Sequence, residues 1–243
     1  MRSLIWVLAL VMALPALAQQ REVDLELVLM ADSSGSITMD EIRFQRAGYA
    51  QALRDPDVVA AIAETAYGRI ALTYVEWGQF DSQDVVVPWT VIEDAGSAAA
   101  FATALMEAPR RARGRNSIGA ALLFGKAMIE ENDIDGWRRI IDFSADSTGN
   151  FNGPTIEEGR AAVLAAGITI NGLAVACRDC VSDWNGGGGG NGDLARQFRE
   201  RIIGGRGAFV VTAETRDTFA EAVKRKLILE ISGLHGGTDV ATE

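Results

Sequence analysis

The chain has 243 residues, a length that fits one large domain. Its 33 Asp and Glu residues outnumber its 23 Lys and Arg residues, and the resulting net charge of -10 disfavours nucleic acid and anionic membrane surfaces as partners. The single histidine, His235, argues against chemistry that needs a histidine base, a histidine-ligated zinc ion or a histidine-bound haem. Two cysteines are too few for a disulfide-dense scaffold.

The N-terminus has the three parts of a secretory signal peptide. Arg2 precedes an unbroken apolar run over residues 4–14, and Ala16 and Ala18 supply the small residues of a cleavage site. The run is shorter than the ~20 residues that a membrane span needs, although an N-terminal anchor is the alternative. We expect residues 1–18 to be removed, the product to be exported to the periplasm or medium, and the mature chain to lack a membrane span.

Beyond this segment, strand-like and helix-like patterns alternate. The segment 23–30 alternates and then becomes fully apolar, and Thr38 and Glu41 form a capping box at the start of the first helix. In chain order the sequence predicts a strand over 23–30, a helix over 38–54, strands over 69–77 and 85–92, helices over 97–107 and 118–131, a strand over 139–144, a helix over 154–166, a strand over 168–176, a helix over 193–203, a strand over 208–212 and a helix over 216–231.

This order predicts an α/β fold with a doubly wound, mostly parallel sheet flanked by helices. The short link 78–84 favours one antiparallel hairpin, and Pro88 places its second strand at the edge of the sheet. We expect one domain over 23–231 and a flexible tail over 232–243. Ligands of such sheets bind beyond the carboxyl ends of the strands, so functional residues are expected in the loops there.

The clearest motif follows the first strand directly, as Asp32-Ser33-Ser34-Gly35-Ser36. Asp32, Ser34 and Ser36 alternate, so a tight loop can turn one carboxylate and two hydroxyls toward a common point. Oxygen ligands of this kind suit a hard cation such as Mg²⁺. The alternative is a turn rich in Ser and Gly that only connects strand to helix.

Three further segments carry candidate ligands. Asp146 follows the strand 139–144 at the same edge of the sheet, where the alternative is a solvated loop aspartate. Asn116 can offer a carbonyl oxygen to a metal or to a metal-bound water. Ser117 could also contribute to the site, but the N-cap of the helix 118–131 is the favoured interpretation for it. Within the strand, Asp142 either orders a hydroxyl or water at the site or is satisfied by neighbouring backbone groups.

Together these residues resemble the von Willebrand factor A domain family, which has the integrin I-like fold. The motif of Asp32, Ser34 and Ser36 matches the family's Asp-x-Ser-x-Ser loop, Asp146 matches its later aspartate, and its threonine position falls on Asn116 or Ser117. The segment 204–211 is similar to a group of secreted bacterial A-domain proteins. The resemblance implies a metal-ion-dependent adhesion site that holds Mg²⁺ or Mn²⁺, with an open position for an acidic residue of a protein partner.

The two cysteines, Cys177 and Cys180, follow a predicted strand, and in an exported chain a local disulfide is the favoured interpretation over redox chemistry. The loop that they open contains the glycine run 186–190, which is interpreted as a flexible loop rather than a calcium repeat.

We therefore expect a secreted, cation-dependent protein-binding domain without catalytic activity. No Gly-x-Ser-x-Gly elbow, dinucleotide fingerprint or phosphate-binding loop occurs, and Ser34 and Ser36 have no histidine to activate them. A metal-dependent hydrolase on the same fold is one alternative. A metal-free A domain that binds through surface shape alone is the other.

Overall fold

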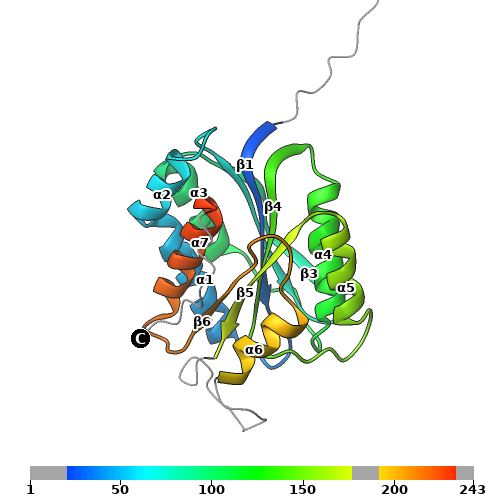
Figure 1. Ribbon diagram of the computed structural model, residues 1–243. Coiled ribbons are helices and arrows are strands. Elements are labelled where there is room, and N and C mark those ends of the chain that lie inside the picture. The colour runs from blue at the N-terminus through cyan, green and yellow to red at the C-terminus, as the bar shows by residue number, and fades with distance from the viewer. Residues whose placement is uncertain (1–20, 177–191, 234–243) are drawn as a thin grey trace, which may run out of the picture.

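The computed structural model describes residues 21–176 and 192–233 (Figure 1). The predicted signal peptide and the predicted disulfide of Cys177 and Cys180 lie outside these residues. The elements in chain order are β1 (Arg21–Asp32), α1 (Met39–Arg54), α2 (Pro56–Ala63), β2 (Ile70–Trp77), β3 (Gln83–Ile92), α3 (Ala95–Glu107), α4 (Ile118–Glu130), β4 (Ile134–Ala145), α5 (Ile156–Ala165), β5 (Thr169–Val175), α6 (Gly192–Arg201), β6 (Val210–Ala213) and α7 (Phe219–Ser232).

The strands form one sheet in the order β3-β2-β1-β4-β5-β6, in which only β2 and β3 pair antiparallel. This arrangement confirms the predicted doubly wound sheet with an edge hairpin. The strand order reverses between β1 and β4, which lie side by side as parallel neighbours. Their carboxyl ends therefore meet at the switch point, where sheets of this type bind ligands.

Helices cover both faces of the sheet, with α1, α2, α3 and α7 on one side and α4 and α5 on the other (Figure 1). Side chains of β1 alternate between the two cores that result: Leu27 and Leu29 enter the cluster with Tyr49 of α1, whereas Val28 and Met30 enter the opposite cluster. Because β1 is covered on both faces, it is buried from Val23 onward, and its second half is the apolar run 27–31 that the sequence shows.

The helix boundaries follow local capping chemistry. Thr38 and Glu41 form the predicted capping box of α1. The helix α2 was not predicted, although Asp55 caps it and Pro56 occupies its first turn. Pro154 lies directly before the α5 N-cap, Thr155, so the helix begins two residues later than predicted.

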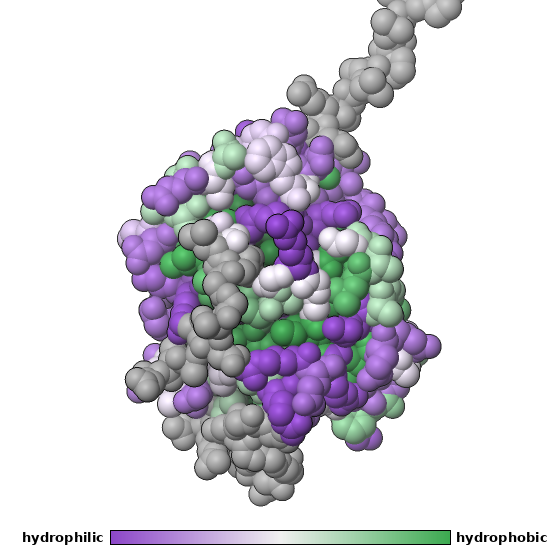
Figure 2. All heavy atoms as spheres, in the orientation of Figure 1, coloured by the Kyte–Doolittle hydropathy of each residue, from purple (hydrophilic) through white to green (hydrophobic). Residues whose placement is uncertain are grey.

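Hydrophilic side chains cover much of the face that Figure 2 shows, and hydrophobic ones reach the surface near its centre. Across the two described ranges, no helix is long and apolar enough to cross a membrane.

Candidate functional site

The loop between β1 and α1 gathers oxygen atoms at the carboxyl edge of the sheet, the lower edge in Figure 1. Asp32 is the last residue of β1 and is buried, and its Oδ1 accepts a hydrogen bond of 2.8 Å from the backbone N–H of Ser34. The hydroxyls of Ser34 and Ser36 lie 3.2 Å apart. The structure thus brings the predicted carboxylate and both hydroxyls together on one tight turn.

Asn116 reaches the same carboxylate from the segment before α4. Its Nδ2 donates to Asp32 Oδ2 at 3.2 Å and to Ser147 Oγ at 3.4 Å. The residue therefore faces Asp32 through its amide nitrogen, whereas we expected the carbonyl oxygen to face the site. Ser117 occupies the predicted N-cap position of α4, but its hydroxyl donates to the Asn152 carbonyl at 2.6 Å and makes no capping bond to the helix.

Asp146 follows β4 and lies close enough to Asp32 for their charges to interact. Burial, and then the charge of Asp146, raises the pKa of the Asp32 carboxyl to about 7. Burial, together with the charge of Glu41, raises the pKa of Asp146. Asp32, Glu41 and Asp146 also line one pocket with the apolar side chains of Phe44 and Val175. Among the described residues, no Lys or Arg forms an ion pair with these two desolvated carboxylates. A positive charge placed between them would therefore stabilise their ionised forms.

Arg110, which the sequence analysis did not single out, holds the backbone of this loop in place. Its guanidinium donates to the carbonyl oxygens of Ser33 at 2.7 Å, Ser34 at 2.8 Å and Ile37 at 2.8 Å, and to Ser33 Oγ at 3.0 Å. These contacts keep three carbonyl groups and the Ser33 hydroxyl directed toward the arginine. No spacing in the sequence signals this contact, because residues 33 and 110 are far apart in the chain.

Asp142 does not belong to this group of oxygen atoms. Its Oδ1 lies 2.7 Å from Lys226 Nζ of α7, which also lies 2.5 Å from Glu230 Oε1, and all three side chains are buried. Asn171 donates to the same Glu230 oxygen at 3.0 Å. The expectation that Asp142 orders a hydroxyl or water at the site is therefore replaced by a core ionic cluster beneath α7.

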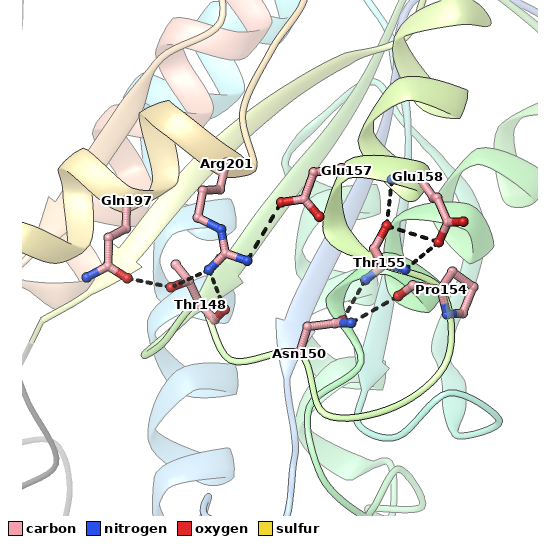
Figure 3. Close-up of polar contacts among 9 residues, drawn as sticks. Thr148, Asn150, Pro154, Thr155, Glu157, Glu158, Gln197 and Arg201 are labelled. Carbon is pink, nitrogen blue, oxygen red and sulfur yellow. Dashed lines mark hydrogen bonds and ion pairs between the residues drawn. The ribbon is translucent and has the colours of Figure 1, made fainter.

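The loop that follows Asp146 is fastened on both sides (Figure 3). Toward α6, Thr148 accepts a hydrogen bond at its carbonyl from Arg201 at 3.2 Å, and its hydroxyl bonds to Gln197. Toward α5, Asn150 Nδ2 donates to the Pro154 carbonyl at 3.0 Å. The loop is thus held between two helices.

The donor set suits a hard cation. Asp32, Ser34, Ser36 and Asp146 supply carboxylate and hydroxyl oxygens, the ligands that Mg²⁺ and Mn²⁺ prefer. Among residues 21–176 and 192–233, no group of three or more His, Cys, Asp or Glu side chains is placed to hold a metal ion. A cation here would therefore depend on the serine hydroxyls and on water to complete its coordination.

A family model described as "Protein of unknown function (DUF1194)" matches residues 22–235. The chain belongs to the DUF1194 family. A search of curated proteins finds no match to this DUF1194 sequence.

Solved structures similar to this DUF1194 chain share its fold. Proximal thread matrix protein 1 from the mussel byssus, with a zinc-occupied MIDAS motif, superposes with a TM-score of 0.61 at 14% identity, over 88% of this chain and 50% of that one. The pilus adhesin SpaC from Lactobacillus rhamnosus GG gives 0.59 at 13% identity, over 88% and 30%. A von Willebrand factor type A protein from Catenulispora acidiphila gives 0.55 at 18% identity, over 86% and 43%.

These similarities confirm the predicted von Willebrand factor A-like fold for the DUF1194 chain. The chain spans half of the mussel protein and less than a third of the pilus adhesin.

Proposed function

We propose that this chain is an exported, divalent-cation-dependent protein-binding domain and not an enzyme. The observation that carries the proposal is the pair of carboxylates at the switch point: Asp32 is buried, Asp146 is close to it, and the pKa of Asp32 is raised to about 7. Water screens the charges of such a buried pair poorly. A divalent cation would offset the desolvation cost of the two carboxylates and remove their mutual repulsion.

In this proposal each residue has a defined role. Asp32, Ser34 and Ser36 contact Mg²⁺ or Mn²⁺ directly or through water, and Asp146 binds through water. Asn116 completes the site after its amide turns to present oxygen. A partner's Glu or Asp carboxylate fills the remaining position, attracted by the cation's uncompensated charge. The signal-like pattern of residues 1–18 supports export.

Two proteins of the same fold have features of the kind proposed here. One of them is described with zinc in a MIDAS motif and another is a pilus adhesin. Both properties are those of the two proteins named. Their low identity to this chain shows only that the fold is shared.

A metal-free interaction domain is the second candidate, and one contact favours it. The Asn116 amide nitrogen already donates to Asp32 Oδ2, so a neutral donor occupies one carboxylate oxygen that a cation would use. The two candidates differ in whether partner binding depends on a divalent cation.

Affinity capture on the immobilised chain separates them. Proteins from an envelope extract are loaded in Mg²⁺ and eluted with a chelator, on columns that carry the wild type, Asp32→Ala or the control Asp133→Ala. Asp133 is an exposed carboxylate in the connection before β4, at the opposite edge of the sheet. We expect a protein that the chelator releases from the wild-type and control columns and that the Asp32→Ala column does not retain. Retention by all three columns in chelator would support the metal-free domain.

A further inference from the structure

Beside the proposed cation site lies a surface that combines exposed aromatic and basic side chains. Phe80 in the β2–β3 connection is 54% exposed, and Phe151 in the β4–α5 connection is 55% exposed. The segment before α4 adds Arg111, Arg113 and Arg115, all exposed. We call these five residues the arginine–phenylalanine surface. Large apolar side chains left in water are informative when they gather near a candidate site.

Backbone contacts join the three segments that carry this surface to the site. The Phe80 N–H donates to Asn152 Oδ1 at 3.1 Å. The Phe151 N–H donates to the carbonyl oxygen of Asn116 at 2.9 Å, and the side chain of the same Asn116 contacts Asp32. Because the loop of Phe151 is also held by α5 and α6, the surface is organised before any partner arrives (Figure 3).

The arginines of this surface can still bind carboxylates of a partner. The Arg115 guanidinium lies 4.0 Å from the centre of the Phe151 ring, a stacking that leaves its N–H groups free to bind a carboxylate. Arg111 is exposed and lies 3.6 Å from the partly buried Asp84, so it already has one carboxylate partner. Near them, Asp81 already accepts a hydrogen bond from the Gln79 amide. The arginine–phenylalanine surface is therefore locally basic, although the net charge of the chain is -10.

We propose that the arginine–phenylalanine surface binds the part of the partner that flanks its metal-bound carboxylate, and that this part is an acidic segment with aromatic or aliphatic side chains. This inference rests on the proposed function, which makes the partner a protein with one carboxylate bound to the cation. Carboxylates of the segment pair with Arg113 and Arg115, and its apolar side chains cover Phe80 and Phe151.

A protein segment fits this surface better than a nucleic acid does. Phosphate groups along a strand would meet the carboxylates of Asp81, Asp32 and Asp146 as well as the arginines. The overall negative charge also repels a polyanion over the distance at which it approaches. A peptide can place its acidic residues only where the arginines and the cation lie.

Fluorescence anisotropy with short synthetic peptides tests the proposal on the full chain. The probes are a peptide of alternating Glu and Phe, one of Glu and Ser, one of Lys and Phe, and single-stranded oligothymidylate, each in Mg²⁺ and in chelator. The variants are Arg113→Glu with Arg115→Glu, Phe80→Ser with Phe151→Ser, and Asp32→Ala. Matched controls at the opposite edge are Arg54→Glu at the end of α1 and Trp137→Ser near the start of β4, where Trp137 is 64% exposed.

We expect the Glu–Phe peptide to bind at least about tenfold more tightly than the other probes. Each double variant should weaken it by about tenfold, while both controls leave it unchanged. Raising the NaCl concentration should weaken wild-type binding, a measurement that needs no variant. Equal affinity for the Glu–Phe and Glu–Ser peptides, preference for oligothymidylate, or unchanged binding in the double variants would overturn the proposal.

The same data separate this inference from the cation proposal. If chelator and Asp32→Ala leave the affinity unchanged while the double variants lower it, the surface stands and the cation role fails. If chelator and Asp32→Ala weaken binding while the double variants do not, the surface fails and the cation role stands.

Discussion

At the scale of single residues, the environment of Asp32 decides what the site can bind. Its two oxygens accept from Ser34 and Asn116, and no Lys or Arg within the described ranges is recorded in an ion pair with it. The arginine nearest to the loop, Arg110, is bonded to backbone carbonyls and to a serine hydroxyl instead. In the proposed function, a divalent cation balances the charge of this carboxylate.

Asn116→Thr should tighten Mn²⁺ binding by a factor on the order of ten. Threonine replaces the amide nitrogen at Asp32 Oδ2 with a hydroxyl oxygen that can bind the cation or its water. Isothermal titration calorimetry of the variant against the wild type gives the two dissociation constants. Asn116→Val is the control, because it removes the amide without supplying an oxygen; a threonine variant that binds no better than the valine variant contradicts the assignment.

Arg110→Ala should lower the free energy of unfolding by about 1–3 kcal/mol, because three loop carbonyls lose a charged donor. It should also weaken cation binding, since the loop is no longer held. Urea denaturation and metal titration measure the two effects. Arg111→Ala, which removes one 3.6 Å contact of an exposed arginine with the partly buried Asp84, should lower stability by at most about 1 kcal/mol. Equal losses in both variants would show that Arg110 has no special role.

At the scale of elements, the close packing of α4 on α5 positions the segment that carries Asn116. A Cβ at Gly119 would lie 2.2 Å from the Thr155 carbonyl oxygen and 2.3 Å from that of Pro154, so only glycine fits there. The Gly119 N–H also donates to Asn150 Oδ1 at 3.1 Å, which ties the start of α4 to the loop after Asp146.

Gly119→Ala should therefore destabilise the protein by about 2–3 kcal/mol in urea denaturation. The matched control is Gly96→Ala in α3, where the new Cβ would meet Asp94 Oδ1 at 3.4 Å. There the higher helix propensity of alanine should leave stability unchanged or raise it by up to about 1 kcal/mol. Similar effects at the two positions would contradict the packing argument.

Most elements could be predicted from the sequence because their signals are local. The apolar run of β1 and the capping box of Thr38 and Glu41 are both readable along the chain. The helix α2, which was not predicted, also has a local signal, Asp55 followed by Pro56. Arg110 and the Lys226 cluster had none, because they depend on contacts between residues far apart in the chain. A negative net charge also conceals the local run of arginines at 110–115.

At the scale of the whole molecule, the strand order brings distant carboxylates together and the core carries a second group of buried charges. Asp32 and Asp146 meet because β1 and β4 are parallel neighbours at the switch point. Under α7, Glu230 shares Lys226 with Asp142, and its Oε2 has no hydrogen-bond partner in the described part of the chain. Burial raises the pKa of Glu230 to about 7, although the charge of Lys226 lowers it.

This cluster should make stability depend on pH. The pKa of Glu230 is higher in the folded chain than in the unfolded one, so the folded state binds the extra proton between pH 4.5 and about 7. As the pH rises through this window, the free energy of unfolding should fall by up to about 1.4 kcal/mol per pH unit. Glu230→Gln should lessen the fall, since Asp32 and Asp146 titrate in both proteins. Parallel profiles for wild type and variant in urea denaturation from pH 5 to pH 8 would refute this assignment.

The central claim is that the carboxylates of Asp32 and Asp146 bind a divalent cation, and calorimetric titration of Mn²⁺ into chelator-treated protein tests it most directly. We expect one ion per chain for the wild type and no binding heat for Asp32→Ala, with circular dichroism showing that the variant is still folded. A stoichiometric, saturable heat that Asp32→Ala abolishes is the expected result. The absence of any binding heat at millimolar Mn²⁺ and Mg²⁺ with folded wild-type protein would contradict the account.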